Sequence, residues 1–121
     1  QAFSVPGQLR QAGVRIALSL DGFWDTRNLV FAAGHVTRYG LSSEDALRAL
    51  TLDAAAIAGV ADRLGSIEVG KSASLVVSDG DIFDYRGHKI EHLWIDGRAV
   101  DLTNHHKQLH ERFKQRYNRA D

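Results

Sequence analysis

The sequence predicts an α/β fold, on the basis of three features of its 121 residues. In residues 1–60, segments with the three- and four-residue apolar spacing of helices alternate with one compact apolar run. Residues 64–81 are rich in glycine and turn-forming residues and contain a short apolar run at 75–77. A hairpin pattern and a charged helical pattern follow. Residues 64–81 therefore mark a boundary between two kinds of architecture.

The composition is that of one globular domain, with 44% hydrophobic and 25% charged residues. Lys plus Arg and Asp plus Glu number 15 each, so no overall field would recruit nucleic acid or an anionic membrane. The absence of cysteine excludes disulfides and thiolate chemistry. No apolar run approaches the roughly 18–20 residues that span a bilayer. We expect a soluble protein with no nucleic-acid or membrane partner; the sequence favours a cytoplasmic location and leaves export open.

The chain begins at Gln1 and contains no methionine. We therefore expect it to be a piece of a longer protein.

The first part of the chain predicts a short helix and then a buried strand. Ser4 is placed to cap a helix that carries Pro6 in its first turn and ends before Gly13. Residues 14–20 become almost continuously apolar, as in a parallel strand that is buried on both faces. This segment ends at Asp21, and α/β barrels place their chemistry at the carboxyl ends of such strands.

Four further helices are predicted, three before the glycine-rich boundary and one after it. Residues 27–39 have one apolar face and end at Gly40. Ser42 opens the next helix as a cap for the N–H of Asp45, and Thr51 is placed to cap a short helix over 52–58. The last helix follows Asn104, with Leu109, Phe113 and Tyr117 on one face.

The segment between these helices predicts strands at 75–78, 89–95 and 98–100. The last two are joined by Asp96-Gly97, a pair that favours a type I′ turn because both central positions need a positive φ.

Three stretches together resemble the C-terminal third of the metal-dependent amidohydrolases, close to the imidazolonepropionase-like branch. They are ALRALTLDAAAIAGV at 46–60, DRLGSIEVGKSASLVV at 62–77 and IDGR at 95–98. GSIEVGK at 65–71 is the most specific part, because its glycines and lysine must recur together. The resemblance covers nearly the whole chain from about Gln8 onward.

This resemblance implies an incomplete fold. Members are (β/α)8 barrels with a small β-sandwich built from both ends of the chain. Residues 1–60 would then be the end of the barrel, with 14–20 as its last strand. Residues 61–103 would supply the C-terminal strands of the sandwich, and 104–121 would form a terminal helix. We expect exposed strand edges and apolar faces, covered by a second copy or by the N-terminal portion.

The resemblance also implies hydrolysis of a C–N bond in a small amide by water bound to zinc or a similar divalent metal. The carboxylate at the end of the last barrel strand accepts the proton of this water and can touch the metal; Asp21 matches that position. Leu20 stands where the family commonly has Thr or Ser, so Asp25 is the alternative counterpart. A third reading makes Asp21 a turn residue bonded to Gly22 or Phe23. The other ligands would lie upstream of Gln1, so we expect no metal and no turnover in this chain alone.

Other residues have a functional and a structural interpretation. Trp24, Arg27 and Asn28 follow Asp21 and would contact substrate, or close the barrel end and cap the next helix. His106 and His110 lie one helical turn apart without a third ligand, so we interpret them as solvated. Packing or surface roles are preferred for His35, His88 and His92, and a turn role for Lys71. The basic residues of the tail, Lys107, Arg112, Lys114, Arg116 and Arg119, lack the aromatic array of a nucleic-acid site.

Two functions follow from this reading. The first is the C-terminal fragment of an amidohydrolase, inactive alone. The alternative is a non-catalytic α+β module that acts by self-association or by binding a partner. A His-x-His pattern upstream would support the first, and an initiator close to Gln1 would support the second.

Overall fold

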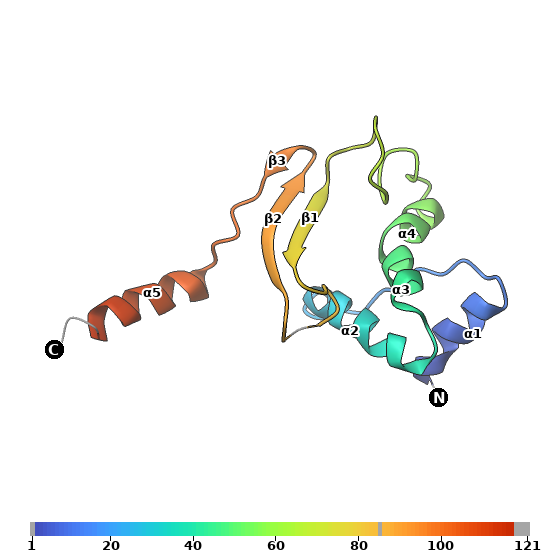
Figure 1. Ribbon diagram of the computed structural model, residues 1–121, viewed down its shortest axis with the longest axis horizontal. Helices are drawn as coiled ribbons and strands as arrows, with labels where there is room; N and C mark the ends of the chain where they lie inside the picture. Colours follow the sequence, from blue (N-terminus) through green and yellow to red (C-terminus); the bar gives the residue numbers. More distant parts are fainter. Residues whose placement is uncertain (1, 85, 118–121) are drawn as a thin grey trace.

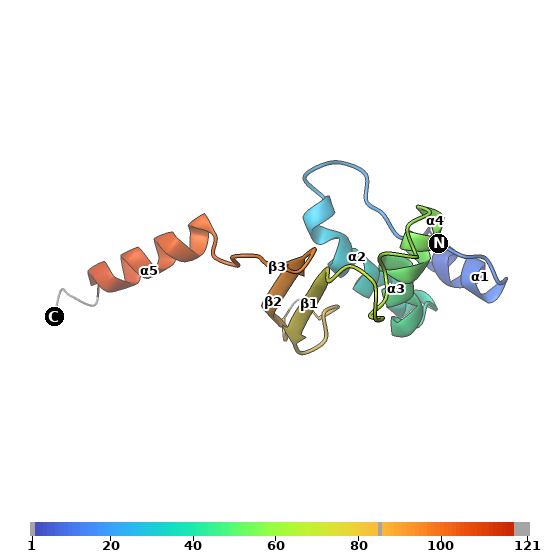
Figure 2. The same cartoon turned by 90° about the horizontal axis from the view of Figure 1, so that it is seen from above.

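The computed structural model describes residues 2–84 and 86–117. Its helices and strands form a helical part, a three-stranded sheet beside it, and a last helix that projects away from both (Figures 1 and 2). The predicted mixture of helices and a sheet is therefore confirmed. Residues 118–121, the end of the predicted 104–121 segment with Arg119, lie outside the described residues.

The first helix forms where the sequence predicts it. A 3-10 turn, η1 (Ala2–Ser4), leads into α1 (Val5–Gln11), and Pro6 lies in the first turn, where a missing N–H costs no helical hydrogen bond. The predicted side-chain cap is wrong, because Ser4 has helical backbone angles and accepts a bond from Gln8 instead. Gly13, with φ +78°, follows the helix end.

The predicted strand at 14–20 is wrong for this structure. Two backbone hydrogen bonds within the described residues join it to helices: Val14 N donates to Leu9 O of α1 at 3.0 Å, and Leu18 N donates to Ala49 O at 3.2 Å. A strand exists only as part of a ladder, and the described sheet lies elsewhere, in residues 75–79, 89–95 and 98–99. The apolar pattern is present, but no strand among the described residues runs beside it.

The predicted helix over 27–39 is confirmed with 3-10 turns at both ends. It consists of η2 (Thr26–Asn28), α2 (Leu29–Val36) and η3 (Thr37–Tyr39), and it ends at Gly40 with φ +99°. Gly34 lets α2 approach the loop between the first two strands. A Cβ on Gly34 would lie 2.8 Å from the carbonyl oxygen of Phe83.

The helix α3 (Ser43–Leu50) begins with the predicted cap. The Ser42 hydroxyl accepts from Asp45 N at 3.0 Å and donates to the Asp45 carboxylate at 2.7 Å. The next helix, α4 (Leu52–Ile57), is not capped by Thr51 as predicted. The Thr51 hydroxyl instead donates to Leu47 O of the preceding turn, at 2.7 Å.

Small side chains make up the buried core. Among the described residues, the buried apolar ones are Leu41 and four alanines, Ala33, Ala46, Ala49 and Ala55. Large apolar residues are exposed instead, among them Ile57 at 57% and Val76 at 48%. The helices thus approach one another closely while much apolar surface faces outward.

The sheet confirms the predicted hairpin. It consists of β1 (Leu75–Asp79), β2 (Lys89–Ile95) and β3 (Arg98–Ala99), antiparallel and in that order, with Leu75 opposite Trp94 and a register shift after Val77. Asp96 and Gly97 both have positive φ, of +49° and +76°, as the predicted type I′ turn requires.

The last helix, α5 (His105–Tyr117), begins as predicted, with Asn104 Oδ1 accepting from Lys107 N at 2.9 Å. It buries none of its described side chains and extends away from the sheet (Figures 1 and 2). Within the described ranges, no helix has the length and apolar character needed to cross a membrane.

Gly65 and Gly70 provide a matched test of how the glycine-rich turn packs on α4. Both have φ near +95°, but a Cβ on Gly65 would lie 2.8 Å from Ala55 Cβ and from Leu52 Cα, whereas one on Gly70 would meet nothing within 4 Å. We expect Gly65→Ala to lower the free energy of unfolding by about 2 kcal/mol and Gly70→Ala by about 1 kcal/mol, from backbone strain alone. Urea unfolding followed by circular dichroism measures both; equal losses would contradict the proposed packing.

Candidate functional site

The predicted site residues lie on one loop, residues 21–28, directly after the extended segment 14–20. Gly22 turns this loop with φ +96°, and Asp25 N donates to Gly22 O at 3.2 Å. The Thr26 hydroxyl donates to Phe23 O at 2.6 Å, and Asn28 N donates to Asp25 O at 2.8 Å. Successive hydrogen bonds therefore fix the backbone of the loop.

The loop presents its side chains to the outside. Asp21, Trp24, Arg27 and Asn28 are all exposed. Phe23 and Trp24 are 85% and 74% exposed, and their rings meet edge to face with centroids 5.6 Å apart. The structure thus places the predicted site residues on one segment. Within the described part of the chain, their side chains form no hydrogen bond or ion pair with one another.

The structure supports neither the turn role of Asp21 nor the helix-capping role of Asn28. The Asp21 carboxylate makes no hydrogen bond to Gly22 or Phe23 within the described part of the chain. Asn28 occupies the N-cap position of α2, but its side chain makes no capping bond.

An apolar pocket of about 280 Å³ lies beside this loop, between residues 18–20 and α2. His35 lines it and packs edge to face against Phe3, with ring centroids 4.9 Å apart, and lies 5.3 Å from the Tyr39 ring. This contact agrees with the packing role that we prefer for His35.

The described residues do not by themselves fit a complete metal site. A four-coordinate catalytic site needs about three protein ligands besides water. Asp21 and Asp25 are the carboxylates of the loop, and no group of three His, Cys, Asp or Glu side chains comes together within residues 2–84 and 86–117. His106 and His110 likewise have no third ligand there.

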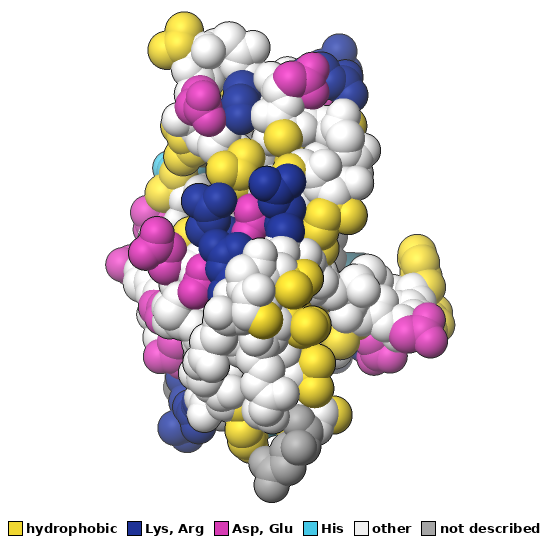
Figure 3. All heavy atoms as spheres, turned by 90° about the vertical axis from the view of Figure 1, so that its right-hand side faces the viewer, with side chains coloured by type: hydrophobic (Ala, Val, Ile, Leu, Met, Phe, Trp, Pro, Cys, Tyr) yellow, Lys and Arg dark blue, Asp and Glu magenta, His cyan; other side chains and the backbone are white. Residues whose placement is uncertain are grey.

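A buried aspartate, which the sequence analysis did not identify, joins four segments. Asp53 in α4 is 3% exposed and pairs with Arg10 of α1 at 3.2 Å and with Arg48 of α3 at 3.3 Å. Arg15, in the segment that leads to Asp21, approaches Asp53 at 3.9 Å. Figure 3 views this side of the molecule, where basic and acidic side chains gather.

Asp45 extends this cluster at the start of α3. Its carboxylate accepts from Arg10 Nε at 2.6 Å. The hydrogen bond from Ser42, together with that from Arg10, holds the pKa of Asp45 below its usual value. The sequence indicated this ion-pair cluster only weakly, because Arg10, Asp45 and Asp53 come from three different helices.

The glycine-rich boundary is held by its own polar contacts and ties α4 to the hairpin. Lys71 Nζ donates to the Ser66 hydroxyl at 2.5 Å and lies 3.1 Å from Glu68. The hydrogen bond from Ser66, and then Lys71, lower the pKa of Glu68. Gly97 N donates to Ala73 O at 2.9 Å. These contacts agree with a structural role for Lys71.

Comparisons with known proteins identify the family of this chain. The family model described as "Amidohydrolase family" matches residues 1–100. The crystal structure of an amidohydrolase from Thermotoga maritima is similar with a TM-score of 0.75 and 39% identity, over 82% of this chain and 26% of that one. The chain therefore belongs to the amidohydrolase family.

Two curated proteins with similar sequences indicate which members of the family this chain resembles. The imidazolonepropionase of Sphingopyxis alaskensis is 39% identical over 75 residues, which are 59% of this chain and 19% of that protein. Adenine deaminase 2 of Agrobacterium fabrum is 45% identical over 65 residues, which are 54% and 10%. The chain is imidazolonepropionase-like, and it spans less than a fifth of the length of these curated relatives.

Proposed function

We propose that this chain is the C-terminal part of a metal-dependent hydrolase that cleaves non-peptide C–N bonds in small linear or cyclic amides. Membership of the amidohydrolase family and the similarity to imidazolonepropionases support this proposal. Residues 1–60 would complete a barrel, residues 61–103 would complete a β-sandwich, and 104–121 would form the terminal helix.

The observation that carries the proposal is the exposed Asp21 at the end of segment 14–20, inside the matched region. In this proposal its carboxylate accepts a proton from water while the water oxygen attacks the amide carbon. The same proton then passes to the amide nitrogen as the C–N bond breaks. A divalent metal, when bound, would lower the pKa of that water.

The rest of the loop would contact the substrate. Trp24 offers an apolar face, and Arg27 and Asn28 offer hydrogen-bond donors. Their exposure leaves these groups accessible to a small molecule.

The missing part of the site would come from outside this chain. Asp21 supplies one carboxylate, and exposed apolar surface surrounds the small core. In this proposal the N-terminal portion of the parent, or a second copy, covers that surface, and the 121-residue chain alone does not turn over substrate.

A graft tests the proposal. The part of the Thermotoga maritima amidohydrolase that matches this chain, about a quarter of its length, is replaced by this chain. The chimera and the isolated chain are then assayed with zinc against linear amides, lactams and imidazolonepropionate. We expect turnover by the chimera only. Sustained turnover by the isolated chain would contradict the proposed inactivity. A folded, metal-loaded chimera without activity would favour the non-catalytic module.

A further inference from the structure

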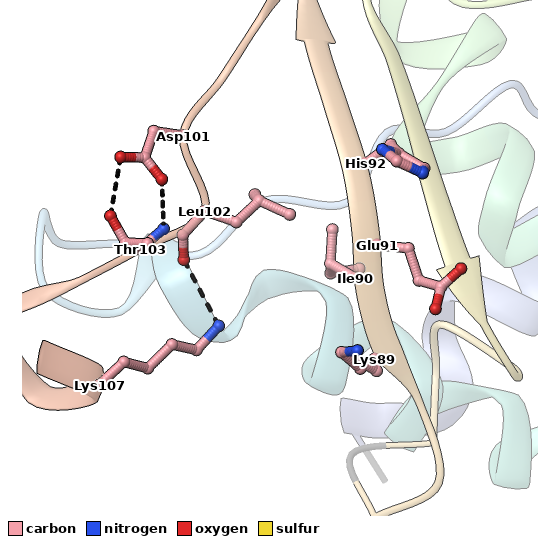
Figure 4. Close-up of a pocket in the computed structure, with 8 residues that line it drawn as sticks. All are labelled: Lys89, Ile90, Glu91, His92, Asp101, Leu102, Thr103 and Lys107. Atoms are coloured by element: carbon pink, nitrogen blue, oxygen red, sulfur yellow. Dashed lines mark hydrogen bonds between the residues drawn. The ribbon is translucent and has the colours of Figure 1, made fainter. Parts of the chain in front are cut away.

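A groove of about 360 Å³ lies between β2 and the segment that leads into α5. Ile90 of β2 and Leu102 of the segment give it apolar walls, and Glu91 and Asp101 add carboxylates. Figure 4 shows Leu102 reaching towards β2. Lys107, in the first turn of α5, closes one side, where its amine donates to Leu102 O at 3.4 Å.

The projecting helix α5 carries an apolar stripe. Leu109, Phe113 and Tyr117 follow one another at intervals of four residues and so share one face. Phe113 is 49% and Tyr117 is 73% exposed. Large aromatic side chains of this kind dominate the energetics of protein interfaces.

The charges of α5 and of the rest of the chain are complementary. Residues 105–117 have four Lys and Arg against Glu111, a net charge of +3. Residues 1–104 have ten Lys and Arg against thirteen Asp and Glu, a net charge of −3. Lys89 and Lys107 balance the groove carboxylates locally, so the attraction acts between the helix and the body as a whole.

The stripe cannot reach the groove of its own chain. Lys107, in the first turn of α5, itself lines the groove. Because a helix rises about 1.5 Å per residue, Phe113 lies about 9 Å and Tyr117 about 15 Å further along the same helix axis. A helix that fills this groove with its aromatic residues must therefore come from another molecule.

We propose that α5 docks in the groove of a second copy, so that two copies exchange their last helices in a symmetric antiparallel pair. The basic helix then lies on a body of opposite charge, whereas two α5 helices packed only against each other would repel. Because these rings are only partly exposed, the four aromatic side chains have on the order of 400–600 Å² left to bury in such a pair. The groove surfaces that they cover add a similar area, against the roughly 1,200 Å² of a specific interface. Ile90 and Leu102 supply further apolar area.

Sedimentation of the full chain tests this inference. We expect a dimer that dissociates as sodium chloride rises from about 50 to 500 mM, because salt screens the charges. Phe113→Ala should raise the dissociation constant about thirtyfold or more. Gln115→Ala, on the opposite face of α5, should change it less than about threefold. A monomer at low salt, or equal effects of both variants, would overturn the proposal.

A charge exchange separates this dimer from nonspecific association. One variant carries Arg112→Glu and Arg116→Glu, which change the net charge of α5 from +3 to −1. The other carries Glu91→Lys and Asp101→Lys, which change the net charge of residues 1–104 from −3 to +1, so each variant alone places like charges in its own dimer. We expect both to be monomeric at concentrations where the unmodified chain dimerises, and their mixture to form a heterodimer. A mixture that stays monomeric, or binding of α5 to anionic vesicles in place of the dimer, would reject the exchange.

Discussion

Asp21→Asn is expected to lower kcat of the active chimera by about 10²- to 10⁴-fold, because an amide cannot accept the proton of the attacking water. The change keeps the size of the side chain and removes only its charge and basicity. Asp21 is exposed, so little loss of stability is expected. Steady-state kinetics with the best substrate of the panel measures the effect.

Asp25→Asn is the matched control, since it lies four residues further on the same exposed loop. We expect this variant to retain kcat within about tenfold, because Asp25 takes no part in the proposed proton transfer. The reverse outcome, a large loss at Asp25 and a small one at Asp21, would assign the proton acceptor to Asp25. Equal small losses would remove both carboxylates from the proposed chemistry.

Asp53→Ala is expected to lower the free energy of unfolding by about 3 kcal/mol, because it leaves a group of arginines without the carboxylate that they share. Arg10 and Arg48 retain 28% and 43% side-chain exposure, so water compensates part of the loss. Urea unfolding measures the effect. Asp53→Asn, which keeps the shape and some hydrogen bonds, should give a smaller loss.

Asp62→Ala controls for the removal of a carboxylate as such. Asp62 is exposed, and the substitution should change the free energy of unfolding by less than about 0.5 kcal/mol. An Asp53→Ala variant as stable as Asp62→Ala would mean that the buried ion pairs contribute nothing net.

Local features of this fold were predictable because both partners lie close together in the sequence. Ser42 and Asp45 form the predicted cap, and Asp96-Gly97 forms the predicted turn. The conformation of residues 14–20 was not predictable in this way, since a strand depends on a neighbouring strand and none of the described residues provides one there. Thr51 failed as a cap because its hydroxyl had a competing acceptor one turn back.

The candidate site was predictable only in part. Asp21 could be proposed as a site residue because it comes directly after an apolar run. Trp24 and Arg27 could be added because they lie on the same continuous segment. The Asp53 cluster was missed because Arg10, Arg15 and Asp53 meet across long sequence separations, which no local spacing reveals.

The alanine core has a thermodynamic consequence. The heat capacity change and the urea m-value of unfolding both scale with the surface that becomes exposed, the former mainly with apolar surface. In this chain many bulky apolar side chains face outward already in the folded state, whereas the buried ones are mostly methyl groups. Unfolding would therefore expose little additional apolar surface, and its temperature and denaturant dependence would be shallow for 121 residues.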